Sequence, residues 1–172
     1  MLLYILIGVI VYLILQSLTQ KKEHAIQATQ VKSDTFIEFK SERGYTIIAP
    51  SRWTAIDGEK EWAIKSSDQQ AQILVYLMTG PVDLDQVLSD ILIGLGKNVE
   101  AATKSEWKDI QIAGLPASRV EFTVGGTDSE TAVRFYDIKS LSQHIVIVLM
   151  TEKLVMELNG KFYEQVIASF KA

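Results

Sequence analysis

Two segments of this sequence are apolar at almost every position, and they restrict the fold more than any other feature. They read AQILVYLM (71–78) and HIVIVLMT (144–151). A strand with one face in water alternates apolar and polar residues, whereas a near-continuous apolar strand has to be covered on both faces. Ile73–Met78 and Ile145–Met150 therefore predict a sheet with helices on both sides.

Two other segments carry the period of an amphipathic helix, one within 82–95 and one in the C-terminal sequence LNGKFYEQVIASF. Apolar residues recur every three or four positions in both. They are Leu84, Leu88, Ile91 and Leu95 in the first segment, and Phe162, Val166 and Phe170 in the second. Asp83 or Asp85 suits the start of the first helix, and Gly96 with Asn98 suits its end.

The remaining segments predict short strands joined by turns. Residues 35–50 suggest a hairpin around Gly44, and Asp57–Gly58 suggests a second turn between two short strands. Alternating residues near 109–112 and 120–124, and the segment TAVRFYDIK, predict further strands. Hairpin-length connections with two or three helices give the fold class α+β: a largely antiparallel β-sheet flanked by helices in a layered sandwich.

The N-terminus differs in character from the rest of the chain. From Leu2 to Leu15 every residue is apolar, and residues 1–18 as a helix would be about 27 Å long, close to the hydrocarbon thickness of a bilayer. We expect a transmembrane helix over 1–19, a polar tether over 20–34 and one domain over 35–172. A cleaved signal peptide is the alternative, but no Lys or Arg precedes the run, and the small-residue sequence AIQA lies well beyond its end.

Positive charge follows the apolar run. Lys21, Lys22 and Lys32 come after it and no lysine or arginine comes before it. Because short positively charged segments stay on the cytoplasmic side, we expect a single-pass protein of the cell membrane with its N-terminus outside and its domain in the cytoplasm. The argument depends on two or three lysines, so the extracytoplasmic side stays open.

Charge and cysteine content exclude several classes of function. The net charge is −4 and the pI is about 5.2, so there is no basic footprint for nucleic acid. The chain has no cysteine, which excludes disulfides, thiolate metal sites, a cysteine nucleophile and lipoprotein acylation. We expect the partners to be the membrane and other proteins.

The order of elements and some local residues resemble the PsbP-like superfamily of PsbP and DcrB-type domains. The similar pieces are GYTIIAPSRW (with Gly44, Pro50 and Trp53), AGLPASRVEFT (with Gly114 and Pro116) and the terminal FYEQVIASF. The resemblance spans roughly residues 35–170. It implies a non-enzymatic domain, often secreted or membrane-attached, that acts by docking onto other proteins.

No motif nominates a catalytic, cofactor or metal site. His144 opens an apolar strand, where a local hydrogen bond would be its ordinary role. The sequence GLGKN lacks the spacing of a phosphate loop. Asp83, Asp85 and Asp90 near a helix start suit the helix dipole and lack the central glycine of a calcium loop. We therefore expect a protein that is not an enzyme.

The three tryptophans carry the one hint of a binding surface. Trp53 suits the core, whereas Trp62 and Trp107 are expected in strands and half exposed, which makes them candidates for partner contact. Packing in the core or at a sheet edge is the explanation that we prefer for each.

Two hypotheses of function remain. The first is a membrane-anchored, non-catalytic docking or accessory domain of a membrane-associated assembly, which predicts an exposed apolar or aromatic patch. The alternative is a small-ligand-binding module that uses a cleft between the sheet and the 82–95 helix, which predicts a pocket of at least about 300 Å³ with convergent polar groups.

Overall fold

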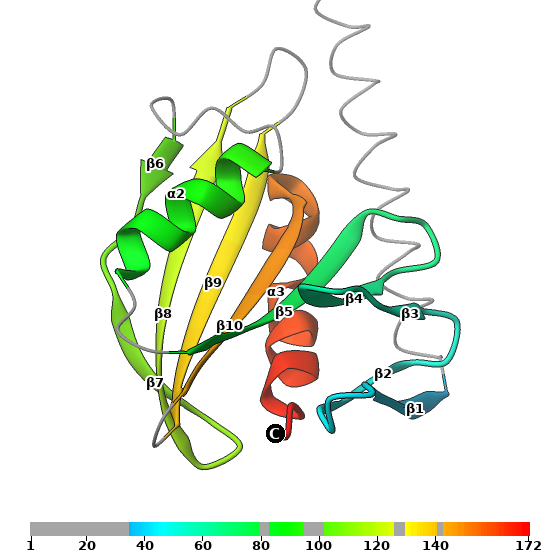
Figure 1. Cartoon of the computed structure of the whole chain (residues 1–172). Helices are drawn as coiled ribbons and strands as arrows, with labels where there is room; N and C mark the ends of the chain where they lie inside the picture. Colours follow the sequence, from blue (N-terminus) through cyan, green and yellow to red (C-terminus); the bar gives the residue numbers. More distant parts are fainter. Residues whose placement is uncertain (1–34, 80–82, 95–101, 126–129, 141–142) are drawn as a thin grey trace, which may run out of the picture. The chain divides into compact units, whose positions relative to one another are not determined.

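An antiparallel sheet of eight strands forms the centre of the fold (Figure 1). The structure is a computed structural model that describes residues 35–79, 83–94, 102–125, 130–140 and 143–172. The strands of this sheet run in the order β3-β4-β5-β10-β9-β8-β6, and β7 also pairs with β8. Their bounds are β3 Thr54–Asp57, β4 Glu61–Lys65, β5 Ala71–Thr79, β6 Ala102–Lys104, β7 Lys108–Ile112, β8 Leu115–Val124, β9 Thr131–Ser140 and β10 Gln143–Glu152.

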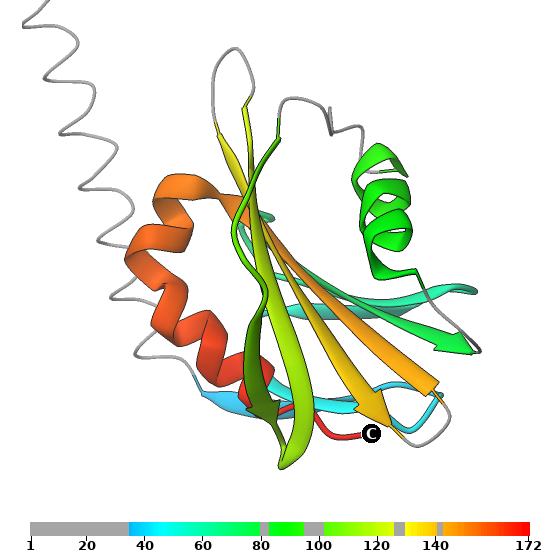
Figure 2. The same cartoon turned by 90° about the vertical axis from the view of Figure 1, so that its left-hand side faces the viewer.

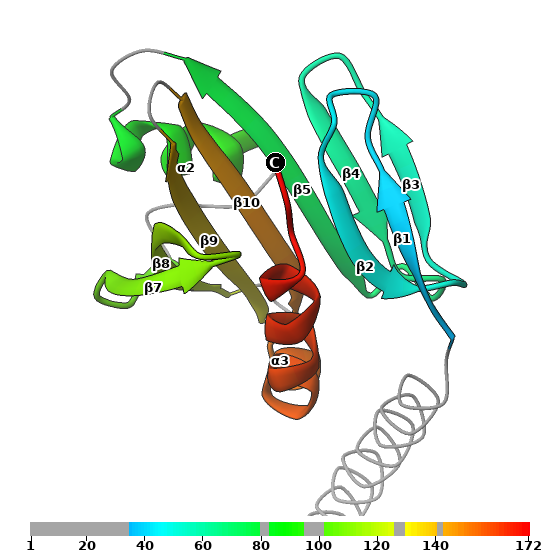
Figure 3. The same ribbon diagram turned by 90° about the horizontal axis from the view of Figure 1, so that it is seen from below.

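A second, two-stranded sheet consists of β1 (Phe36–Lys40) and β2 (Thr46–Pro50). The other edge of β2 meets the end of the chain, where Thr46 and Lys171 form an antiparallel bridge. Figure 3 shows the β1–β2 and β3–β4 hairpins side by side. Hydrogen bonds join their turns, since the Ser41 hydroxyl donates to Asp57 (2.7 Å) and the Arg43 guanidinium donates to the carbonyl of Glu59 (2.8 Å).

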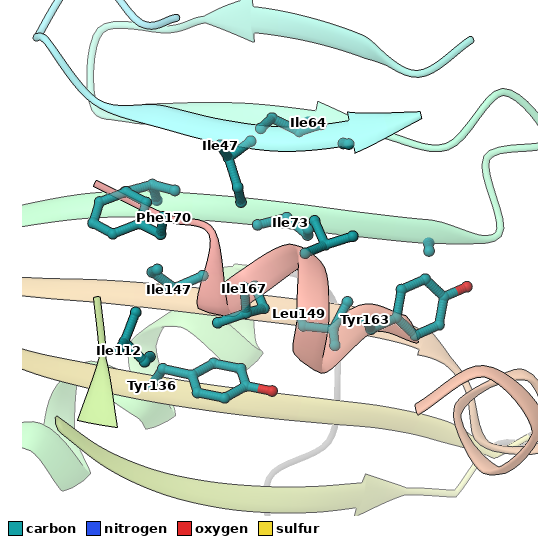
Figure 4. Close-up of a cluster of buried hydrophobic side chains, with 14 of the residues drawn as sticks. Ile47, Ile64, Ile73, Ile112, Tyr136, Ile147, Leu149, Tyr163, Ile167 and Phe170 are labelled. Atoms are coloured by element: carbon teal, nitrogen blue, oxygen red, sulfur yellow. The ribbon is translucent and has the colours of Figure 1, made fainter. Parts of the chain in front are cut away.

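Helices cover both faces of the eight-stranded sheet, as the apolar strands predicted. Helix α3 (Lys153–Ala168) lies on one face and α2 (Leu84–Gly94) lies on the other (Figure 2). Alternate residues of β5 and β10 therefore enter two separate cores. The core under α3 also takes in β2 and the final residues of the chain (Figure 4); it includes Ile47, Ile64, Ile73, Tyr136, Ile147, Tyr163, Ile167 and Phe170.

The predicted fold class is confirmed in its α+β part. The 82–95 helix appears as Leu84–Gly94, with the Asp83 carboxylate accepting a hydrogen bond from the amide of Gln86 (3.2 Å), as a helix N-cap does. Strand β6 was not predicted. The predicted transmembrane segment 1–19 lies outside the described residues, and within the described ranges no helix is long and apolar enough to cross a membrane.

Candidate binding groove between α2 and the sheet

A groove of about 560 Å³ lies between α2 and strands β4 and β5. Helix α2 supplies one wall, and the face of the sheet beneath it supplies the floor. The groove is lined by Lys60, Glu61, Gln72, Leu74, Tyr76, Met78, Val87, Asp90, Ile91 and Gly94. It occupies the place that the ligand-binding alternative predicted and is larger than the minimum that this alternative requires.

The alternation of side chains along β5 builds the floor. Gln72, Leu74, Tyr76 and Met78 point to the α2 side, whereas Ile73 and Val75 between them enter the core under α3. Antiparallel pairing with β4 places Glu61 opposite Tyr76. The period-2 pattern of a single strand thus gives one core and one groove.

The wall is held in place by the apolar stripe of α2. Leu88 and Leu92 are buried in the second core, and this fixes the rotation of the helix so that Val87 and Ile91 line the groove. Asp90 lies on the same wall, and its carboxylate accepts a hydrogen bond from the Gln86 amide group (2.7 Å).

The polar groups of the groove differ in charge. Burial, and secondarily the negative charge of Glu61, raises the pKa of Tyr76, so its phenol is neutral and can both donate and accept a hydrogen bond. Glu61 and Asp90 add two carboxylates and Lys60 adds one ammonium group. Such a lining can bind an amphipathic molecule or segment by apolar contact and by hydrogen bonds.

A histidine–aspartate pair, of which only the aspartate is buried, lies on the same face of the sheet. Nδ1 of His144 is 2.9 Å from Oδ1 of Asp137, and Asp137 is 1% exposed. His144 pairs in register with Met78 of the groove floor, but neither member of the pair lines the groove. The pair supplies the local hydrogen bond that was expected of a histidine at a strand start. Within the part of the chain that the structure describes, no three His, Cys, Asp or Glu residues cluster as a metal site would need.

The opposite face carries a network of ion pairs between α3 and the sheet. Glu164 accepts from Arg119 (2.5 Å) and from Arg134 (3.1 Å), and Arg134 also pairs with Glu121. The hydroxyl of Tyr136 lies 3.4 Å from Glu164, and burial is the main cause of its raised pKa. Each charge has an opposite partner, so the network fastens α3 to β8 and β9 and leaves no charge for a ligand.

No family model matches this sequence, and no curated protein matches it. Solved structures do match. CyanoP, the cyanobacterial PsbP of Synechocystis sp. PCC 6803, superimposes with a TM-score of 0.59 at 12% identity, covering 81% of this chain and 93% of that chain. The domain has the PsbP-like fold. The Saccharomyces cerevisiae Ran-binding protein Mog1p matches with a TM-score of 0.54 at 11% identity, covering 81% of this chain and 96% of its own.

A third protein with the PsbP-like fold is LpqN of Mycobacterium tuberculosis, which is involved in cell envelope biogenesis. It matches with a TM-score of 0.50 at 12% identity, and the match covers 84% of this chain and 95% of that one. These structural matches establish the fold. At identities this low they do not establish the function, which has to be argued from the residues of this chain.

The PsbP-like fold buries one of the two candidate tryptophans and leaves the other half buried. Trp62 is 0% exposed, because its position in β4 faces the core under α3. The expectation of a half-exposed Trp62 is therefore wrong, whereas packing in the core, the explanation preferred from the sequence, is confirmed for it. Trp107 lies between β6 and β7 and not in a strand; it is half buried and packs against the second core.

The groove residues on β4 and β5 were not singled out from the sequence. The segment 71–78 was interpreted as a near-continuous apolar run, and its polar groups Gln72 and Tyr76, on the same side of the strand, were given no role. Two polar groups with the period of a strand, within an otherwise apolar segment, were the signal that could have identified the floor.

Proposed function

We propose that this protein is a membrane-anchored, non-catalytic accessory domain that docks onto another protein through the α2 groove. Residues 1–19 are the anchor, residues 20–34 are the tether, and the lysines after the anchor favour a cytoplasmic domain. The observation that carries the docking proposal is the groove, since it is a hollow on the described surface with both apolar and charged lining.

A protein partner suits the groove because its apolar floor continues beyond it. Leu74 in the groove pairs with Ala63, and Ala63 pairs with Ile56 on the outermost strand β3. Ile56 is 56% exposed. An apolar row therefore leads from the groove to the edge of the sheet, and an amphipathic segment of a partner chain could cover all of it. That Mog1p, a protein of the same fold, is Ran-binding agrees with a docking role for such a domain.

A small organic ligand is the second candidate. The volume of about 560 Å³ lies within the range of small-molecule sites. A ligand of that size would occupy the groove between β5 and α2 and would not reach Ile56.

Site-specific photo-crosslinking from inside the groove tests both candidates. The full chain, produced in cells, carries the photoreactive residue p-benzoylphenylalanine in place of Gly94. A Cβ added there meets no atom within 4 Å, so a side chain at this position starts in open space. Gly125, at the end of β8, has equally open surroundings and lies outside the groove, so it is the matched control. The readout is the mass of the crosslinked product, with and without Ile56→Asp.

The docking proposal expects a protein adduct at position 94 and none at 125, with the adduct lost in the Ile56→Asp variant. A small adduct at position 94 that survives Ile56→Asp would establish the ligand alternative instead. Equal products, or none, at both positions would overturn the groove as the binding site.

A further inference from the structure

The outer side of α3 carries apolar side chains that are not fully buried, and one of them, Phe162, packs against the edge of the core under α3. Leu154 and Leu158 lie one turn apart, and Leu158 is 47% exposed. Phe162 follows one turn later and is half buried. Its ring lies 6.1 Å from the ring of Phe36, which is 45% exposed. These four residues form what we call the α3–β1 patch.

The patch lies where the chain enters the domain. Phe36 is the first residue of β1, one residue after Thr35. The tether of residues 20–34 precedes it, and its 15 residues (34 − 20 + 1) can span at most about 50 Å when fully extended. The root-mean-square reach of a flexible chain of this length is only about 20 Å. An anchored domain would thus hold Phe36 close to the bilayer surface.

We propose that the α3–β1 patch rests on the lipid surface beside the anchor. This inference depends on the membrane attachment proposed above and is independent of the groove. Aromatic and leucine side chains suit the boundary between headgroups and acyl chains. Lys161 is exposed three residues after Leu158 on the same side of α3, and its long side chain can reach the headgroup phosphates.

Because the tether would already hold the domain at the membrane, a small apolar patch is enough to orient it there. A free domain with four apolar side chains would bind a bilayer only weakly, as a single acyl chain does. A domain already tied to the membrane has a high effective concentration at its surface, so weak contacts can set its orientation. In this orientation the α2 groove, on the opposite face of the sheet, stays accessible to a partner (Figure 2).

Quenching by brominated lipid tests the orientation in the full chain. The natural sequence has no cysteine, so an environment-sensitive fluorophore can be attached at one introduced cysteine in each variant. The variants are Leu158→Cys in the patch, Ile93→Cys on α2 as the control, and Tyr12→Cys in the predicted anchor. Ile93 is also an apolar residue on a helix, and its exposed fraction is 61%. Each variant is reconstituted in phosphatidylcholine vesicles with or without brominated acyl chains.

We expect loss of emission in brominated lipid at positions 12 and 158, and unchanged emission at 93. Loss at 12 alone would overturn the inference and retain the anchor. Equal loss at 93 and 158 would show that no face is preferred, and this also overturns it. Emission at 158 that is blue-shifted without quenching would mean that protein covers the patch. No loss at position 12 would overturn both the anchor and this inference, leaving the groove to be judged by its own crosslinks.

Discussion

At the scale of single residues, burial alters the ionisation of several tyrosines in the described part of the chain. Burial raises the pKa of Tyr163 to about 12, and the negative charge of Asp68 contributes to the rise. Tyr163 belongs to the core under α3 and contacts the rings of Trp53 and Phe162. Its folded-state pKa is thus above the ordinary value of 10, so the fold favours the neutral phenol.

This difference in pKa makes stability depend on alkaline pH. Since the folded pKa is the higher one, the contribution of Tyr163 is fully present below pH 10 and is lost as the pH rises through about 12. Between pH 10 and about 12, ionisation of Tyr163 should lower the free energy of unfolding by on the order of 2 kcal/mol. We expect this fall to be absent from the Tyr163→Phe variant. Urea unfolding at several pH values measures, for each protein, the slope of the free energy of unfolding against pH. Identical slopes for the two proteins would contradict the raised pKa.

At the scale of elements, the turn between β7 and β8 shows how local conformation sets strand register. Ile112 pairs with Leu115, so the loop has two residues, Ala113 and Gly114. Both have positive φ, 51° and 79°. Two-residue hairpin loops favour this backbone because its twist matches that of the strands. Glycine adopts it freely, whereas alanine is strained there.

Substitutions in this turn should have opposite effects. Ala113→Asn should raise the free energy of unfolding by about 0.5–1 kcal/mol, because asparagine tolerates the left-handed region. Gly114→Ala should lower it by about 1 kcal/mol, although an added Cβ meets no atom within 4 Å. Chemical denaturation of the two variants checks this. The same sign for both changes would refute the conformational explanation.

Periodicity explains which elements could be predicted. The apolar runs at 71–78 and 144–151 were strong enough to predict strands covered on both faces, and the stripe through Leu84 and Leu88 predicted α2. The face that Trp62 presents could not be predicted: β4 pairs with its sequence neighbours β3 and β5, but the burial of Trp62 depends on α3, which is distant in sequence. The groove needed the same tertiary information. Its helix wall was predicted, but its floor comes from alternate positions of β5.

At the scale of the whole molecule, the last residues of the chain close the core. Phe170 is 1% exposed, and its ring lies 5.7 Å from that of Tyr45, which precedes β2. The neighbouring Lys171 forms the backbone bridge to Thr46, and its side chain is exposed. The start and the end of the domain therefore complete one hydrophobic layer together.

Removing the aromatic ring at the end of the chain should destabilise the entire domain. We expect Phe170→Ala to lower the free energy of unfolding by about 3 kcal/mol, because a large buried side chain is lost. Lys171→Ala, with its backbone bridge intact, should change it by less than about 0.5 kcal/mol. Thermal and chemical unfolding of the two variants measure the difference. Similar small losses for both would mean that the chain end contributes little.

The bridge between Thr46 and Lys171 also has a consequence for synthesis on the ribosome. The two residues are 125 positions apart (171 − 46). At translation rates of about 5–20 residues per second, Thr46 of β2 is therefore synthesised about 6–25 s before Lys171. During this interval Ile47 and Ala49, fully buried in the finished domain, have no complete core to enter. The apolar run of residues 2–15 leaves the ribosome before the domain is complete, so the proposed anchor would be available to a membrane-targeting machinery while the domain is still unfolded.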